Sequence, residues 1–329
     1  MKSTVKDWRP TASLDTLRLR ASLLAVARRH FAERDVLEVE TPALSTAGVT
    51  DVHLDCAVAS APALGWHGYL ATSPEYPMKR LLAAGSGDIF QICHVFRDGE
   101  RGRMHNPEFT MIEWYRRGFD IDLLMNDVEA LLGAMLAPGR SPGAWRPAMR
   151  LSYREAMRRH SGIDAFEDSI STMRKVLQER GVTPPADLGE ERDSWLDLVM
   201  STLVGPRLGQ GALCFVYGYP ASQAALARLR STEPPTAERF EAYLDGVELA
   251  NGFRELTDPV EQRVRFEADQ AARRAAGREV PAIDEQLLAA LEAGLPDCAG
   301  VALGFDRVVM LACGAKSIDE VIAFPADRA

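Results

Sequence analysis

Two arginines far apart in the chain stand where they can hold phosphate oxygens. Arg97 follows an apolar run over 89–96 that is typical of a β-strand, and it opens a charged loop leading to a second strand-like run over 109–115. Gly99 in that loop lets the backbone come close to a ligand. Arg307 lies in the first turns of an expected helix near the C-terminus. Guanidinium groups match phosphate oxygens, so these residues indicate a nucleotide site. A solvated hairpin with a charged tip fits the first stretch alone equally well.

Glutamates form the second group with chemical potential. Glu248 and Glu255 lie in the run ELANGFRE, in one strand of an expected hairpin that turns at 245–246. Residues seven apart on an unbroken strand face opposite ways, so a bulge or bend at 251–252 is predicted to turn both carboxylates to one side. Converging carboxylates beside phosphates can bind Mg²⁺. The alternative is two exposed strand residues.

A further glutamate, Glu75, follows Ser73 and Pro74 where a helix is expected to begin near residue 76. Taken by its position alone, this carboxylate is expected to stabilise the N-terminus of the helix.

Helices and strands that mix along the chain must position these residues. Residues 44–68 are expected to be irregular, and 137–210 to form a helical insertion packed on a single domain over 1–329. Helices are expected over 14–34 (with Ser13 as N-cap), 120–132, 258–277 and 284–293, and strands over 36–40, 89–96, 109–115, 213–217, 240–244 and 247–250.

The composition of the chain argues against several classes of protein. The five cysteines show no CxxC pair, which argues against a disulfide framework and a zinc site. The start of the chain has no apolar signal region and no apolar run is long enough for a membrane span, so a cytoplasmic protein without a membrane partner is expected. A net charge of −9 without a basic tail weakens the case for a nucleic-acid partner.

Three segments resemble the signatures of class II aminoacyl-tRNA synthetases in their lysyl-type form. FRDGERGRMHNPEFTMIEWY over 96–115 resembles motif 2, the helix and strand over 14–42 resemble motif 1, and GVALGFDRVVML over 300–311 resembles motif 3. They stand in the order of the family and cover about 14–329. The resemblance implies an α+β fold, a mostly antiparallel sheet flanked by helices, in a homodimer formed through motif 1.

The resemblance also assigns roles to residues. Arg97 would hold the α-phosphate of ATP and Arg307 the γ-phosphate, as the catalytic pair. Glu248 and Glu255 would bind Mg²⁺. The ATP-binding residues would be Arg97, Asp98, Gly99, Glu100, Asn106, Phe109, Glu248, Leu249, Gly304 and Arg307, and the residues binding the amino acid would be Ser73, Pro74, Glu75, Glu113, Tyr115, Glu255 and Ala302.

One departure concerns the adenine-facing contact. Many lysyl-type enzymes read F-R-N-E here, whereas this chain has Gly99 in place of that Glu, with Glu100 next. Either Glu100 takes over with a shift of one residue, or the loop backbone does.

Only about a dozen residues precede the motif 1 helix, so no anticodon-binding domain is expected. Together with Ser73 and Ala302, where lysyl-tRNA synthetases usually have Ala and Gly, this resembles the paralogues that attach lysine or (R)-β-lysine to a lysine side chain of elongation factor P. The resemblance then implies elongation factor P as partner, and tRNA is not expected. Two alternatives stay open: a minimal synthetase that charges tRNA, and a non-catalytic paralogue that binds an amino acid.

Overall fold

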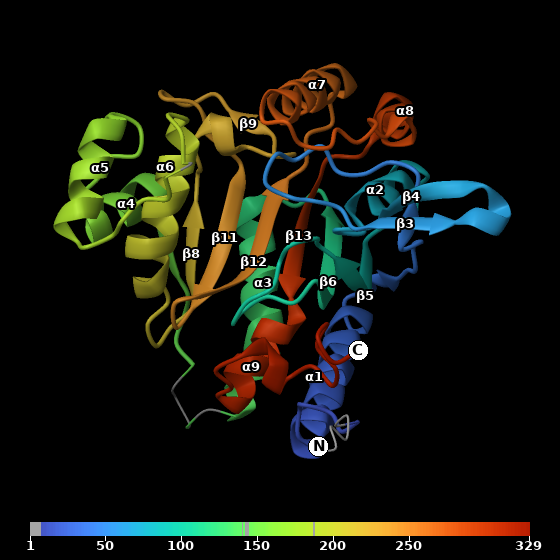
Figure 1. Ribbon diagram of the computed structural model, residues 1–329. Coiled ribbons are helices and arrows are strands. Elements are labelled where there is room, and N and C mark those ends of the chain that lie inside the picture. The colour runs from blue at the N-terminus through green and yellow to red at the C-terminus, as the bar shows by residue number, and fades with distance from the viewer. Residues whose placement is uncertain (1–7, 140, 142–144, 187) are drawn as a thin grey trace, which may run out of the picture.

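A single large sheet organises the protein. The computed structural model describes residues 8–139, 141, 145–186 and 188–329. Eight strands pair in the order β1-β5-β6-β13-β12-β11-β8-β7, and all pairs except the outermost two, β1/β5 and β7/β8, are antiparallel (Figure 1). The bounds are β1 (Leu37–Glu38), β5 (Ile89–Phe96), β6 (Glu108–Arg117), β7 (Met149–Ser152), β8 (Cys214–Tyr217), β11 (Arg239–Leu244), β12 (Val247–Arg254) and β13 (Cys298–Gly304).

Nine helices surround this sheet within the described residues. Their bounds are α1 (Leu14–Ala32), α2 (Glu75–Ala83), α3 (Ile121–Leu136), α4 (Tyr153–Ser161), α5 (Ile170–Glu179), α6 (Arg192–Val199), α7 (Pro259–Ala275), α8 (Glu285–Gly294) and α9 (Phe305–Cys313). The N-cap predicted for α1 is confirmed, because the Ser13 hydroxyl accepts a hydrogen bond from the Thr16 amide at 3.1 Å. The expected α+β class is confirmed.

The segment over 44–68 was expected to be irregular, and this prediction is wrong in part, because only 46–57 and Gly65 lie outside a helix or strand. It contributes most of a three-stranded antiparallel sheet of β2 (Leu44–Ser45), β3 (Val58–Ala61) and β4 (Trp66–Leu70). These strands are short, two to five residues each, so none is long enough to show the clear apolar alternation by which strands are recognised. A third sheet consists of β9 (Leu229–Arg230) paired with β10 (Thr236–Ala237), which are two residues each.

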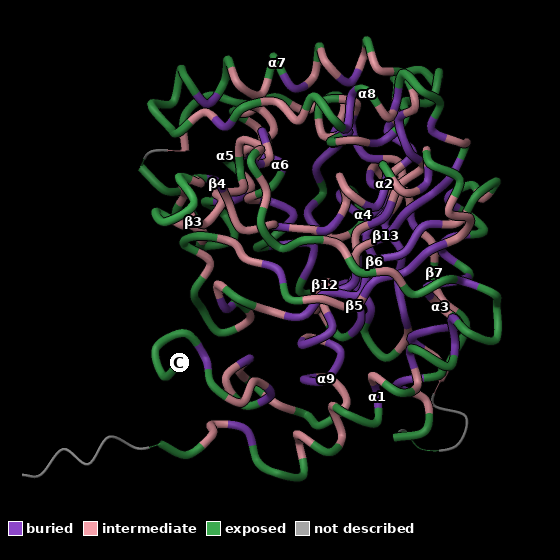
Figure 2. The backbone as a smooth tube through the Cα atoms, turned by 90° about the vertical axis from the view of Figure 1, so that its right-hand side faces the viewer, coloured by how far each residue is buried: buried purple, intermediate pink, exposed green. Residues whose placement is uncertain are grey.

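The two faces of the main sheet have different roles. Alternate residues such as Ile112, Trp114 and Val301 pack with α1, α3 and α9 in the largest hydrophobic cluster. Their neighbours Glu113, Tyr115 and Ala302 point to the opposite face, which borders a cavity. The burial pattern follows this division, with the sheet buried at the centre and the outer turns of α7 exposed (Figure 2).

The region over 137–210 is mainly helical, as predicted, but it also supplies β7, which pairs with β8 of the main sheet. Its helices α4, α5 and α6 enclose a second hydrophobic cluster that includes Cys214 and Tyr243 from the main sheet. Residues 140, 142–144 and 187 of this region lie outside the described residues. That the chain forms one domain stays a prediction.

A bulge is present in β12, but not at the predicted position. Ala242 pairs with Ala250 and Tyr243 pairs with Glu248, so Leu249 has no partner on β11. The extra residue therefore lies at 249 and not at 251–252. This shift turns Glu248 from the core face to the cavity face, the same face as Glu255.

None of the helices within the described residues combines the length and the apolar character that crossing a membrane requires.

Candidate active site

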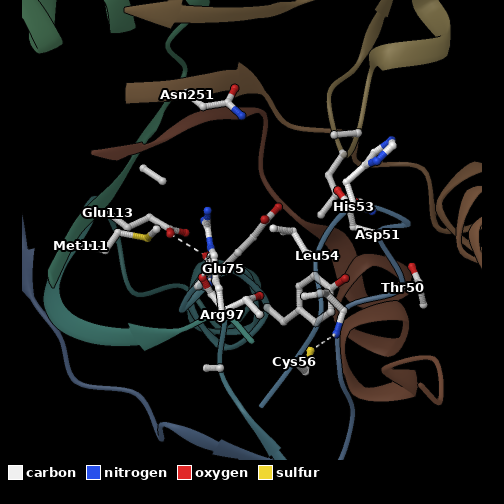
Figure 3. A pocket seen from close by; sticks show the side chains of 18 of the residues that line it. Thr50, Asp51, His53, Leu54, Cys56, Glu75, Arg97, Met111, Glu113 and Asn251 are labelled. Atoms are coloured by element: carbon white, nitrogen blue, oxygen red, sulfur yellow. Dashed lines mark hydrogen bonds between the residues drawn. The ribbon is translucent and has the colours of Figure 1, made fainter. Parts of the chain in front are cut away.

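A cavity of about 920 Å³ lies on the open face of the sheet. Figure 3 shows part of its wall: Glu113 projects from β6, Glu75 and Arg97 line the same cavity, and the loop over 50–56 lies on another side. The predicted site residues that line it are Ser73, Glu75, Arg97, Glu100, Asn106, Phe109, Glu113, Tyr115, Glu248, Leu249, Glu255, Ala302, Gly304 and Arg307.

Three predicted site residues lie elsewhere. Pro74 is the N-cap residue of α2 and does not line the cavity. Asp98 and Gly99 border a smaller cavity of about 290 Å³ on the other side of the loop. Gly99 has φ +75°, a left-handed conformation that suits glycine, and Glu100 after it lines the main cavity. The geometry therefore favours Glu100 over Gly99 for the contact left open by the sequence.

Arg97 lies over an aromatic ring at the start of the motif 2 loop. Its guanidinium carbon is 5.1 Å from the centroid of Phe109. Its Nε donates to the carbonyl oxygen of Thr72 at 3.4 Å, and Glu100 lies 3.7 Å away. The side chain of Arg97 is 25% exposed. The guanidinium is thus held in place while part of it faces the cavity, where it can bind an anion.

Arg307, at the start of α9, is held from two sides. One nitrogen donates to the carbonyl oxygen of Glu248 at 2.9 Å and the other lies 2.7 Å from Nε2 of His105. Burial and the charge of Arg307 lower the pKa of His105, so the neutral imidazole accepts a hydrogen bond from the guanidinium. His105 of the motif 2 loop therefore positions Arg307 of motif 3.

Asn106 has a structural place in the same loop. Its side-chain amide donates to the carbonyl oxygen of Glu108 at 2.7 Å and accepts from the amide of Ala326 at 3.1 Å. These contacts tie the motif 2 loop to the C-terminal end of the chain.

A carboxylate with two hydroxyl partners stands at the end of the cavity that Ser73 borders. Glu113 accepts hydrogen bonds from the hydroxyl of Ser73 at 2.6 Å and from that of Tyr115 at 2.7 Å. Burial, together with repulsion from Glu75, raises the pKa of Glu113 to about 7. Because both hydroxyls donate to it, this carboxylate is oriented to receive a cation.

Two more carboxylates complete this end. Glu75 and Glu255 both contact the ammonium of Lys79, at 2.6 Å and 2.5 Å. Glu255 is fully buried, and apart from this ion pair its oxygens accept no hydrogen bond from the described residues. Burial and repulsion from Glu75 raise the pKa of Glu255 to about 8, although Lys79 opposes the shift. Buried carboxylates that repel each other gain the most stabilisation from a cationic ligand.

Gly300 makes room for this cluster. A Cβ atom there would lie 2.3 Å from the ring of Tyr115 and 2.6 Å from Oε1 of Glu255, far inside van der Waals contact. Sequence reasoning missed Gly300, Lys79 and His105. The signal for Lys79 was its place four residues after Glu75 on one helix. Nothing local marked the other two.

A magnesium ion can be tested against these residues. Among the described residues, no group of three His, Cys, Asp or Glu side chains could hold a metal by itself. Beside nucleotides, however, Mg²⁺ is usually held by one or two carboxylates together with phosphate oxygens. Glu248 fits this role: it lines the cavity, and burial and the charge of Glu241 raise its pKa. Glu255 is already in an ion pair with Lys79, so a divalent ion bound to it would meet stronger repulsion from that ammonium than a singly charged group would.

Comparisons with known proteins agree with this geometry. The family model for tRNA synthetases class II (D, K and N) matches residues 1–328. Proteins named elongation factor P–(R)-β-lysine ligase from Vibrio cholerae serotype O1 and Klebsiella pneumoniae are 50% identical over 330 and 331 residues, and the one from Salmonella paratyphi B is 49% identical over 331 residues. Each alignment covers 99% of this chain and 100% of the relative.

Proposed function

The chain belongs to the class II tRNA synthetases of the D, K and N type, and from this premise we propose that it activates (R)-β-lysine with ATP and transfers it to a lysine side chain of elongation factor P. It is an ATP-dependent ligase that forms AMP, in keeping with the family and with the names of its relatives.

One observation carries the choice of a diamino acid, and the names of the relatives favour (R)-β-lysine over lysine, which has the same charges. Glu75, Glu113 and Glu255 gather at one end of the cavity, and Arg97 contributes a cation to the same wall. (R)-β-lysine has two ammonium groups and one carboxylate, so its charges complement this arrangement. A neutral side chain would leave buried carboxylates without partners, which costs several kcal/mol per ion, on the order of 3–5 for a broken buried pair.

In the first step an oxygen of the amino-acid carboxylate attacks the α-phosphorus of ATP, and pyrophosphate leaves. Arg97 would bind the attacking carboxylate and the α-phosphate, and Arg307 the γ-phosphate. Phe109 would stack on adenine. The protein supplies orientation and positive charge, and no protein nucleophile is required.

In the second step a neutral lysine amine of elongation factor P attacks the carbonyl carbon of the adenylate. An amide bond forms, AMP leaves with the electron pair of the broken bond, and the amine loses a proton. Glu75, Glu113 and Tyr115 would hold the amino groups through both steps, with Ser73 and Ala302 shaping the pocket.

Glu248 would hold Mg²⁺ together with phosphate oxygens, and the bound ion would neutralise phosphate charge. Glu255, the second ligand that the family resemblance suggests, could join it only by giving up Lys79. The protein would work as a homodimer in the cytoplasm, where its acceptor takes part in translation.

The test offers the purified protein ATP, Mg²⁺ and (R)-β-lysine or lysine, with elongation factor P and tRNA in the same tube. Intact-mass analysis follows elongation factor P and acid precipitation follows the RNA. We expect a mass gain on elongation factor P, larger with (R)-β-lysine, and uncharged tRNA. Charged tRNA with unmodified protein would overturn the proposal in favour of a minimal synthetase.

Variants connect the activity to the site. Arg97→Ala is expected to lower the rate of adenylate formation at least about 100-fold, because the charge it provides is used in the transition state. Arg101→Ala is the matched control. Arg101 lies in the same loop but outside the cavity, with Asp319 and Asp327 as partners.

A further inference from the structure

Lys79 is the buried cation behind the amino-acid end of the cavity, and neither the family resemblance nor the lining of the cavity assigns it a role. It is 1% exposed, on the inner face of α2. Its ammonium lies 2.6 Å from Oε1 of Glu75, 2.5 Å from Oε2 of Glu255 and 5.4 Å from the centroid of the Phe253 ring.

The energetics make a purely structural role for this lysine expensive. Lysine is almost never fully buried unless it is paired, because taking an ammonium out of water costs several kcal/mol. A hydrophobic residue of similar size would fill the same space on α2 at lower cost. Burial lowers the pKa of Lys79, but Glu255 and Glu75 raise it more, so the charge is retained. The cost of burying this ammonium therefore indicates that its positive charge has a function beyond filling space.

The charges at this end of the cavity can be counted. Glu75, Glu113 and Glu255 together carry −3 when ionised, and Lys79 brings the sum to −2. Two ammonium groups of one diamino acid would neutralise it. Lys79 also joins a carboxylate on α2 to one that follows β12, two elements that belong to different parts of the fold.

Building on the proposed function, we propose that Lys79 is a positioning and specificity-determining residue. Its buried ammonium fixes the positions of the Glu75 and Glu255 carboxylates relative to each other. It also sets the charge of the amino-acid subsite at −2, so that the subsite fits an amino acid with two positive charges. It acts through the two glutamates and does not touch the substrate.

The experiment measures adenylate formation by pyrophosphate exchange, with KM for (R)-β-lysine and KM for ATP determined separately. The variants are Lys79→Met, Lys79→Arg, Glu255→Gln and the double variant Lys79→Met/Glu255→Gln. The matched control is Lys175→Met. Lys175 also pairs with a glutamate four residues away on one helix, Glu179, but it is exposed. Thermal melting reports whether each variant is folded.

We expect Lys79→Met to raise KM for (R)-β-lysine at least about tenfold, as the loss of a buried charge partner predicts, while KM for ATP stays within about twofold. Lys79→Arg keeps the charge and should recover part of the affinity. The double variant restores −2 by removing one charge of each sign. It is therefore expected to bind the amino acid better than either single variant.

An unchanged KM for the amino acid in Lys79→Met would overturn the inference. A double variant that binds the amino acid no better than the worse of the two single variants would also overturn it, because a merely structural role predicts that result. If Lys79→Met does not fold, the double variant, which removes the lysine together with one of its two carboxylate partners, decides by the same comparison with Glu255→Gln. A wild type that activates no diamino acid would overturn the proposed function together with this inference, whereas an active wild type with an indifferent Lys79→Met overturns the inference alone.

Discussion

Glu113 shows how a single residue combines orientation and charge at this site. Both of its oxygens accept from hydroxyl groups, on Ser73 and Tyr115, and its neighbour Ala302 on β13 leaves space in front of it. The carboxylate cannot turn away without breaking two hydrogen bonds. Such a group contributes affinity for an ammonium mainly because its position is set before the ligand arrives.

Glu113→Gln should therefore raise KM for the amino acid by about 10- to 100-fold, the loss expected for one charge-assisted hydrogen bond, with little change in KM for ATP. Pyrophosphate exchange measures both. Glu108→Gln on the same strand is the control, because Glu108 is half exposed and pairs only with His94 at the surface among the described residues. Equal effects of the two variants would contradict the placement of Glu113 in the amino-acid subsite.

The raised pKa values of two buried glutamates give a second prediction at the scale of single residues. The pKa values of Glu113, about 7, and Glu255, about 8, lie above the ordinary value of 4.5. The native protein thus keeps protons that the unfolded chain has lost, and its stability without ligand should fall as pH rises from about 5 to 8. A diamino acid binds the ionised forms and relieves their repulsion.

The rise in melting temperature caused by (R)-β-lysine should consequently be larger at pH 8 than at pH 6. Differential scanning fluorimetry with and without the amino acid measures it. The shift caused by ATP alone is the control, since the nucleotide would bind away from these carboxylates. A shift that shrinks between pH 6 and pH 8 would refute the charge argument.

Among the elements, β12 and β13 decide which side chains face the cavity. The bulge at Leu249 brings Glu248 to the side of Glu255, and Gly300 on β13 leaves room for Tyr115. Each feature depends on a single residue, so a substitution of only a few atoms at Leu249 or Gly300 should strongly affect which side chains face the cavity.

Gly300→Ala tests the second feature. The added methyl group would overlap the ring of Tyr115 and the carboxylate of Glu255, so we expect a loss of about 1–3 kcal/mol in the free energy of unfolding and a strong rise in KM for the amino acid. Urea denaturation and kinetics measure these. Gly139→Ala serves as control, because a Cβ there meets no atom within 4 Å. A fully stable, active Gly300→Ala would show that the sheet tolerates the methyl group.

The contact between motif 1 and motif 3 is a further feature at this scale. Arg20 of α1 donates to Asp306 of α9 and, at 2.6 Å, to the hydroxyl of Thr110 on β6. Asp306 in turn accepts from the amide of Thr110 at 2.7 Å. This network fixes the start of α9, from which Arg307 projects.

Arg20→Met should cost about 3–5 kcal/mol of unfolding free energy, because it leaves the buried Asp306 without its cation, and should lower kcat through Arg307. Arg18→Ala, which breaks an exposed pair with Asp15 on the same helix, should cost less than about 1 kcal/mol. Urea denaturation compares them, and similar losses would argue against a structural role for the buried pair.

At the scale of the whole molecule, assembly is the open expectation. The strand β1 lies at one edge of the sheet with Leu37 54% exposed, and the neighbouring α1 begins with Leu14, which is 64% exposed. Edge strands with exposed apolar residues are typical places for pairing with another chain. The homodimer through motif 1 would cover both leucines.

Light scattering coupled to gel filtration should then give twice the mass of one chain, and Leu37→Lys should shift the protein toward monomer at low concentration. Val260→Lys is the control, since Val260 is 72% exposed on α7 at the other end of the molecule (Figure 1). A monomer at all concentrations in the wild type would contradict the prediction.

The order of three short motifs was enough to predict the family, the α+β class and most of the lining of the cavity, because residues that bind nucleotides need particular types at particular spacings. The hairpin of β5 and β6 and the cap of α1 were also predictable, since they depend on neighbours in sequence. Short strands within 44–68 were not, because tertiary pairing and not apolar pattern holds them.

Only the tertiary structure decided where side chains point and which charges meet. The position of the bulge, at Leu249 and not at 251–252, depends on the pairing with β11. The place of Lys79 between Glu75 and Glu255 depends on α2 packing beside the end of β12. The contact between Lys79 and Glu255 joins residues more than a hundred positions apart, and the bulge depends on how β11 and β12 pair, so spacing along the chain predicts neither.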